Sequence, residues 1–253
     1  MIGELGARTL VWDGCVNVRD LGGIPTENGG ATRFGAVIRS DNIRGLTEDG
    51  WRALARHGVV RIVDLRWPEE LAQDPARELE VEVVHVSVIG PSLAESRDYL
   101  RTLDAHVDSV DDVADHYAWS YVEFLERNRD RFGLALGAIA DADGTVVIHC
   151  MGGKDRTGLV AALLLRLAGV ALDEIGRDYS LSGPNLAATL ESWLADAPNE
   201  RERRRREKLS GTPAVAMTRV ITEIEDRHGS VTGYLEAAGL QPDQIQRLRE
   251  RLR

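Results

Sequence analysis

The sequence predicts a single α/β domain whose central, largely parallel sheet has four or five strands and is flanked by helices. Short β-branched runs at 36–39, 59–65, 81–88 and 146–148 have the length and composition of buried strands. Longer segments with helical spacing lie between them, and strands that alternate with helices favour a parallel sheet covered by those helices. No low-complexity linker divides the 253 residues, so one domain is expected over the whole chain, 1–253.

The N-terminal segments are expected to supply most of the sheet. Residues 9–12 are predicted as an edge strand, followed by a turn-rich segment over 13–30. Thr47 has the side chain of an N-cap for an amphipathic helix that ends before Gly58. Arg19 and Asp20 are expected to pair internally and fix the turn-rich segment, with a place at the rim of a site as the alternative.

Helices are expected to dominate the remainder of the chain. A stripe at helical spacing, formed by Tyr117, Tyr121, Phe124 and Leu125, predicts a core-facing helix within the mostly helical span 92–140. Gly169 is predicted to end one helix, and Asn185 to cap another. The arginine- and glutamate-rich run 200–208 predicts an exposed helix with many ion pairs. The other predicted helices span 157–167, 172–181, 186–194, 213–228, 231–238 and 242–252.

The most informative stretch is 146–158, which is V-V-I-H-C-M-G-G-K-D-R-T-G. A strand that ends at His149 is followed by a tight, glycine-containing loop and then by a helix from Thr157. Backbone N–H groups at a helix N-terminus, together with the helix dipole, form an anion pocket. We call residues 150–156 the anion loop. Because it begins with a cysteine and ends with an arginine, it predicts phosphate chemistry rather than phosphate binding alone.

Each residue type in the anion loop suits a step of phosphoryl transfer. The helix N-terminus and nearby cations favour the thiolate of Cys150, which is therefore the predicted nucleophile. Arg156 has a planar fork for two phosphate oxygens, and Asp155 is the predicted acid for the leaving oxygen and base for water. Thr157 is predicted to donate to the thiolate when it departs. The residues predicted to bind phosphate or a second anionic group are Met151, Gly152, Gly153 and Lys154.

One alternative to phosphate chemistry is excluded by the sequence and three remain open. The loop is not a nucleotide-binding Walker loop, because two positions of that motif do not match: Ile148 occupies its first glycine position, and Asp155 follows the lysine. A sulfurtransferase and a binding module for phosphorylated ligands both stay possible, as does a buried structural cysteine. For His149, we expect hydrogen bonds that hold the loop rather than proton transfer.

Two upstream carboxylates compete with Asp155 for the role of general acid. Asp64 and Arg66 lie at the carboxyl end of a predicted strand, where ligands of parallel sheets gather, so they are predicted to support the anion loop. Glu69 occurs in a Trp-Pro-Glu triplet that is similar to the mobile W-P-D loop of many tyrosine phosphatases. It lies far upstream of Cys150 and is glutamate rather than aspartate, so Asp155 is favoured.

The chain resembles a bacterial family of protein tyrosine and lipid phosphatases. Residues 149–158 match its H-C-x-x-G-K-D-R-T-G loop, and the likeness extends from about Asn17 to the C-terminus. Other matching segments are N-V-R-D-L-G-G from 17, V-D-L-R from 63, D-Y at 178 and H-G-S from 228. The resemblance implies a tyrosine phosphatase-like fold and cysteine-dependent hydrolysis without metal or other cofactor. It implies phosphotyrosine, phosphoserine/threonine and phosphoinositides as substrates.

The resemblance also implies a helical lid over the active site at about 183–212. The apolar underside of this lid would be formed by Leu186, Leu190, Trp193 and Leu194. A fixed pair of surface helices is the alternative. The sequence gives no information on oligomeric state.

Composition narrows the possible partners. The net charge of −10 argues against nucleic acid and anionic membranes as general partners, so phosphorylated protein or phosphoinositide is the expected substrate. No leader or long apolar segment is seen, which predicts a cytoplasmic protein without membrane insertion, although export by an unconventional route stays open. Cys15 is expected to pack at a strand end, with a protective bond to Cys150 as the alternative. No His and carboxylate cluster predicts a metal site.

Overall fold

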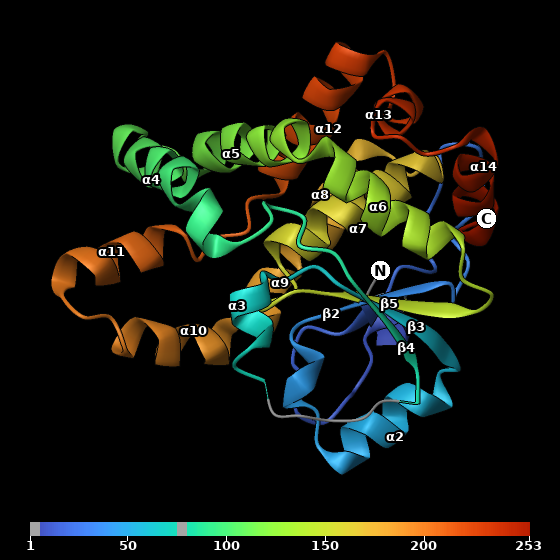
Figure 1. Cartoon of the computed structure of the whole chain (residues 1–253), viewed down its shortest axis with the longest axis horizontal. Coiled ribbons are helices and arrows are strands. Elements are labelled where there is room, and N and C mark those ends of the chain that lie inside the picture. Colours follow the sequence, from blue (N-terminus) through green and yellow to red (C-terminus); the bar gives the residue numbers. More distant parts are fainter. Residues whose placement is uncertain (1–5, 75–79) are drawn as a thin grey trace.

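The computed structural model describes residues 6–74 and 80–253, which form one α/β layer structure (Figure 1). Its five-stranded sheet has the order β1-β2-β5-β3-β4. Four strands run parallel, and β1 pairs antiparallel with β2 at one edge. The strands are β1 (Arg19–Asp20), β2 (Val37–Ser40), β3 (Val59–Asp64), β4 (Glu82–His85) and β5 (Thr145–His149).

The strand register brings the carboxyl ends of the three inner strands to one level. His149 at the end of β5 is aligned with Ser40 of β2 and with Asp64 of β3. The strands therefore stop together, and the chain that leaves β5 enters the crevice above the sheet edge, where α/β folds bind ligands. This alignment fixes where Cys150 lies.

Helices cover the sheet unequally. Figure 1 shows α2 (Glu48–Arg56) on one face and most of the other helices on the opposite face. Side chains of β5 alternate accordingly: Val147 packs in a small core with α2, whereas Val146 and Ile148 join the large helical core. Successive side chains of β5 point to opposite faces of the sheet, and both faces are covered by helices. Both faces of β5 are therefore apolar.

The remaining helices follow in chain order. The short ones are η1 (Ile43–Gly45), α3 (Pro68–Leu71) and α9 (Ser182–Asn185). The longer ones are α4 (Leu93–Ser109), α5 (Val113–Arg127), α6 (Arg129–Ala140), α7 (Asp155–Leu167), α8 (Leu172–Ser180), α10 (Ala187–Ala195), α11 (Glu200–Lys208), α12 (Ala214–His228), α13 (Val231–Ala237) and α14 (Pro242–Arg251). Among the described residues, none of these helices is long and apolar enough to cross a bilayer.

The predicted helix boundaries are largely confirmed. Thr47 caps α2 by accepting the N–H of Gly50. Gly58 and Gly169 have φ of +65° and +86°, so each ends its helix in the left-handed conformation that glycine adopts without strain. The arginine-rich run forms α11 at the predicted residues, and its side chains make ion pairs along and beyond the helix, such as Arg206 with Glu202.

Two predictions of local structure are wrong, and one predicted strand is shorter than expected. Residues 9–12 form no strand, because only Thr9 makes an isolated bridge, to Arg19, before the chain turns. Asn185 does not cap the following helix: it is itself the last residue of α9, and its amide donates to Asn17. The strand predicted over 81–88 is shortened to Glu82–His85, because it lies at the sheet edge and has one neighbour.

Candidate active site

The anion loop joins the carboxyl end of β5 to the first turn of α7. The side chain of Cys150 is buried at the start of the loop, and Arg156 is largely buried in the first turn of the helix. Gly153 has φ of +65°, and a Cβ there would lie 2.4 Å from the carbonyl oxygen of Ser40. Only glycine therefore fits this turn against the end of β2.

Three successive carbonyl groups of the anion loop are held from outside. The N–H of Asn42 donates to the oxygen of Met151 at 2.9 Å, and the Asn17 amide donates to that of Gly152 at 2.9 Å. Arg39 donates through Nη2 to the oxygen of Gly153 at 2.7 Å.

Across a planar trans peptide the next N–H points opposite to the carbonyl, so these amides turn inward. Within residues 6–74 and 80–253, the N–H groups of Gly152, Gly153 and Lys154 have no hydrogen-bond partner. Such a group of converging donors at a helix N-terminus is suited to bind an anion.

A buried carboxylate fixes the arginine that holds the loop. Asp178 on α8 pairs with Arg8, with Arg19 at 3.2 Å and with Arg39 at 2.6 Å. Burial alone would raise the pKa of Asp178, but the three guanidinium groups hold it well below its usual range. Asp178 therefore buttresses the loop through Arg39.

Arg19 and Asp20 fix the turn-rich segment, but not by pairing with each other. The Arg19 guanidinium donates to Asp178, and it donates to the side-chain oxygen of Asn17 at 2.7 Å. Asp20 accepts the N–H groups of Gly22 at 2.7 Å and of Gly35 at 2.8 Å. Because Asn17 is the residue that holds the Gly152 carbonyl, Arg19 also orients the anion loop.

The fork of Arg156 is held by a residue that the sequence analysis did not identify. Glu70 on α3 accepts from Nη1 and Nη2 of Arg156 at 2.5 and 2.8 Å. The Trp67 ring lies 5.1 Å from the same guanidinium. Burial lowers the pKa of Arg156, but the bond to Glu70 and the charge of Cys150 raise it above its usual value. The fork is therefore a fixed cation at the end of the loop that Cys150 begins.

The segment that contains Glu70 is the short helix α3. The N–H of Trp67 donates to Glu70 at 2.8 Å, which satisfies one backbone donor at the start of this helix. Trp67 is not one of the Ser, Thr, Asp or Asn residues that mark a helix start, so the sequence gave no signal for this contact. It also gave no indication that the same carboxylate binds an arginine 86 residues further on.

Asp64 lies beneath the anion loop as an ionised, buried carboxylate. It accepts from Arg66 at 2.7 Å and lies 3.4 Å from Nε2 of His149. Burial raises its pKa, yet the hydrogen bonds from His149 and Arg66 lower it far more, so the net pKa is well below its usual range. Asp64 thus holds His149, whose Nδ1 lies 3.2 Å from the carbonyl oxygen of Cys150. This arrangement suits support of the loop and leaves Asp64 no proton to donate.

Glu69 lies at the surface and binds a different element. Its carboxylate accepts the N–H of Leu93, at the start of α4, at 3.1 Å. That bond lowers the pKa of Glu69. Glu69 therefore stabilises the beginning of α4, and the geometry gives it no contact with the anion loop.

Asp155 is the first residue of α7 and remains partly exposed. Its Oδ1 accepts a hydrogen bond from Tyr121 of α5, and the Tyr121 hydroxyl lies 2.9 Å from that of Tyr179. Tyr121 was assigned to a core stripe, and it is indeed fully buried. The helical spacing predicted its burial but not its contact with Asp155.

The side chain of Lys154 is buried and points away from solvent. Its Nζ donates to the Tyr117 hydroxyl at 2.6 Å and to the carbonyl of Leu209, just after α11, at 2.8 Å. Burial lowers the pKa of this lysine, and the charge of Asp155 partly opposes the shift. Lys154 therefore links the anion loop to α5 and to the end of α11.

Thr157 follows Arg156 and is fully buried. In the described part of the chain its hydroxyl oxygen has no hydrogen-bond partner. Met151 is the exposed residue of the loop, with 44% of its surface accessible, and its sulfur lies 4.0 Å from Arg66.

A pocket of about 190 Å³ lies beside the anion loop. Gly152, Lys154 and Asp155 form its wall on the loop side. The residues that line it from the segment 183–212 are Gly183, Leu186, Thr189, Leu190, Trp193, Leu209 and Ser210. The pocket thus combines apolar side chains, those of Leu186, Leu190, Trp193 and Leu209, with polar residues of the anion loop.

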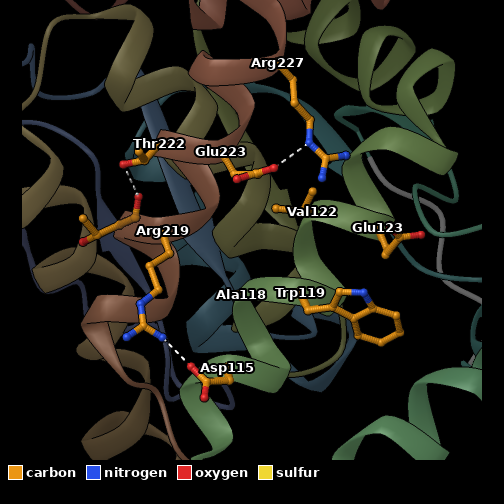
Figure 2. Close-up of a pocket in the computed structure, with 10 residues that line it drawn as sticks. Asp115, Ala118, Trp119, Val122, Glu123, Arg219, Thr222, Glu223 and Arg227 are labelled. Carbon is orange, nitrogen blue, oxygen red and sulfur yellow. Dashed lines mark hydrogen bonds and ion pairs between the residues drawn. The ribbon is translucent and has the colours of Figure 1, made fainter.

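A second groove, of about 530 Å³, lies between α5 and α12 (Figure 2). Its two arginines are both paired with carboxylates of the same groove: Arg219 contacts Asp115 at 2.6 Å, and Arg227 contacts Glu223 at 2.8 Å. The groove therefore lacks the free positive potential that an anion site needs.

The two cysteines are free thiols. Cys15 does not lie in a strand; its thiol donates to the carbonyl of Asn42 at 3.5 Å. Burial and the charge of Asp41 raise the pKa of Cys15 to about 12. Among the described residues, no group of three or more His, Cys, Asp or Glu side chains is placed to hold a metal ion.

Comparison with known proteins agrees with this geometry. The model of a family described as the tyrosine phosphatase family matches residues 10–253. A tyrosine-protein phosphatase of Nostoc commune is 30% identical over 231 residues, covering 86% of this chain and 74% of that protein. The triple specificity protein phosphatase PtpB of Mycobacterium tuberculosis is 29% identical over 269 residues, covering 93% of this chain and 96% of that protein. The chain therefore belongs to the tyrosine phosphatase family, and it is a phosphatase.

Proposed function

We propose that the protein hydrolyses phosphomonoesters in two steps through a phosphocysteine on Cys150. The observation that carries this proposal is the outward anchoring of three successive loop carbonyls by Asn42, Asn17 and Arg39. It turns the loop amides towards the space between Cys150 and Arg156, where a phosphoryl group would be bound from several sides.

In the first step the Cys150 thiolate attacks phosphorus, and the bond between phosphorus and the ester oxygen breaks. Asp155 gives its proton to that leaving oxygen, while Arg156 and the loop amides hold the equatorial oxygens. In the second step water attacks phosphorus and passes a proton to Asp155. The phosphorus–sulfur bond breaks, and the Thr157 hydroxyl donates to the departing thiolate.

Phosphotyrosine is the substrate class that the pocket beside the loop favours. The apolar side chains of Leu186, Leu190 and Trp193 line the same pocket of about 190 Å³ as Asp155, which suits an aromatic leaving group. The relative PtpB is named for triple specificity, so phosphoserine/threonine and phosphoinositides are proposed as further substrates. The chain is then a dual-specificity phosphatase that acts on phosphorylated protein first.

We further propose that the segment 183–212 acts as the lid of this pocket. Its helix α10 has no fully buried residue, and α11 contacts α4 through ion pairs such as Arg201 with Asp108. Exposed ion pairs contribute little in water, so most of α10 and α11 is weakly fixed, whereas the end of the segment is held where the carbonyl of Leu209 accepts from Tyr117 and Lys154. Substrate entry could therefore move these two helices without disturbing the core.

Turnover of p-nitrophenyl phosphate tests the proposed activity. We expect hydrolysis that is unaffected by a chelator such as EDTA, together with inhibition by vanadate, which mimics a five-coordinate phosphoryl group. Two rival functions are tested in the same preparation. Thiosulfate-to-cyanide transfer without phosphatase activity would indicate a sulfurtransferase, and phosphate binding without turnover would indicate a binding module.

The Lys154→Gln variant tests whether this lysine selects a doubly anionic substrate. Because the ammonium group is bound to Tyr117 and Leu209, we expect a change of less than about 3-fold in kcat/KM for a phosphotyrosine peptide. We expect a ratio of phosphopeptide to phosphoinositide activity that is nearly the same as in the wild type. A selective loss of phosphoinositide hydrolysis of about 10-fold or more would contradict this expectation and assign Lys154 to the second anionic group.

A further inference from the structure

Helix α5 holds the end of the anion loop with two tyrosines that are one helical turn apart. Tyr117 contacts Lys154, and Tyr121 contacts the next residue, Asp155. Both tyrosine side chains are buried. Residues four apart on a helix share a face, so the two contacts act on consecutive loop residues from one rigid element.

The direction of the Tyr121 contact can be assigned. Burial raises the pKa of Tyr121 well above its ordinary value, and the nearby charge of Asp155 raises it further. Tyr121 therefore keeps its proton and donates it to Oδ1 of Asp155. Since that proton is already used, the 2.9 Å contact with Tyr179 has Tyr179 as the donor and Tyr121 as the acceptor.

The hydrogen bond that the Asp155 carboxylate accepts falls on one oxygen. Tyr121 donates to Oδ1, and Nζ of Lys154 lies 3.7 Å from the same atom. Within residues 6–74 and 80–253, no side chain or backbone group donates a hydrogen bond to Oδ2. A carboxylic acid with one oxygen held by a donor carries its proton on the other oxygen.

We propose that Tyr121, backed by Tyr179, is the positioning residue that makes Oδ2 of Asp155 the proton-transferring atom. This inference rests on the proposed function. In the first step the Oδ2–H bond breaks as the leaving oxygen takes the proton, and the new negative charge is stabilised at Oδ1 by the Tyr121 hydroxyl. In the second step the proton of the attacking water returns to Oδ2.

The Tyr121→Phe variant tests this assignment, because it removes the hydroxyl and keeps the ring. With phenyl phosphate, a poor leaving group, we expect kcat/KM, which depends only on the first step, to fall about 10-fold with KM nearly unchanged, since the acid is misplaced. With 2,4-dinitrophenyl phosphate, whose leaving group needs little protonation, we expect kcat/KM to fall less than about 3-fold. Equal losses with both substrates, or a loss confined to KM, would overturn the proposal.

The double variant with Asp155→Asn separates positioning from general damage. Asp155→Asn alone should lower kcat for phenyl phosphate about 10²-fold, and adding Tyr121→Phe should then cost nothing more. If Tyr121→Phe lowers activity equally in both backgrounds, its effect does not pass through Asp155 and the inference is wrong. If Asp155→Asn lowers kcat/KM equally for both substrates, the acid assignment fails and the inference with it. Cys150→Ser tests the phosphocysteine separately, so a failure of the proposed function is recognised independently.

Tyr234→Phe is the matched control. The Tyr234 hydroxyl is also buried, and it donates at 2.9 Å to the carbonyl of Leu125 on α5, the helix that carries Tyr121. We expect Tyr234→Phe to keep wild-type kinetics with either substrate. Should Tyr121→Phe fail to fold, as judged by circular dichroism, Tyr179→Phe replaces it. That variant should show a smaller loss that is again larger for phenyl phosphate, and the absence of any such difference would overturn the proposal.

Discussion

Replacing Cys150 by serine is expected to abolish hydrolysis of p-nitrophenyl phosphate, with a loss of at least about 10⁴-fold in kcat. A serine hydroxyl is not ionised at neutral pH, and in the part of the chain that the structure describes no histidine base is placed to activate it, because the adjacent His149 is bound to Asp64 and to the carbonyl of Cys150. The measurement is steady-state turnover, with the thermal denaturation midpoint as the check on folding.

Binding of vanadate or phosphate supplies the control for this prediction. Cys150→Ser should keep its affinity for phosphate, since the loop amides and Arg156 remain. Arg156→Ala should lose turnover as well as phosphate affinity, because the bidentate fork is gone. Substantial activity in Cys150→Ser would contradict a phosphocysteine, and unchanged phosphate affinity in Arg156→Ala would place the anion elsewhere.

The Asp178→Asn variant is expected to have the largest effect on stability, about 3–5 kcal/mol, because it leaves buried guanidinium groups without their carboxylate. Asp178 is fully buried between Arg8, Arg19 and Arg39. Activity should fall with stability, since Arg39 also holds the Gly153 carbonyl. Urea denaturation followed by fluorescence or circular dichroism gives the free energy of unfolding.

The effect of this variant should depend on pH in a definite direction. The folded-state pKa of Asp178 lies below its unfolded value, so its stabilisation is complete above about pH 4 and is lost as the pH falls further, through the folded-state pKa. The difference in unfolding free energy between wild type and Asp178→Asn should therefore shrink in acid. Asp243→Asn, which removes an exposed partner of Arg247, should change stability little. Equal stability of the two variants at neutral pH would contradict the assignment.

The order of chemical groups in the anion loop could be predicted because it is local. A strand, a glycine turn and a helix N-terminus are determined by neighbouring residues, so the positions of Cys150, Gly153 and Arg156 follow from the sequence. The alternation of strands and helices likewise predicted the parallel sheet. That prediction is confirmed, with five strands and an antiparallel edge strand.

The residues that support the loop could not be predicted in the same way. No role was predicted for Glu70, and Tyr121 was predicted as part of a core stripe, yet each binds a residue of the anion loop far along the chain. Hydrophobic periodicity reports which face of a helix is buried. It contains no information on which polar atom satisfies a buried hydroxyl, because that depends on the packing of distant elements.

The sequence by itself determined the fold class, the phosphatase family and the chemical groups that a phosphoryl group would meet. Only the tertiary structure decided how those groups are held. It placed Asn17, Arg39 and Asn42 on the outer side of the loop, and Tyr121 on one oxygen of Asp155. The physical reason is that chemical identity is a property of single residues, whereas direction is imposed by hydrogen bonds between segments that meet only when the chain folds.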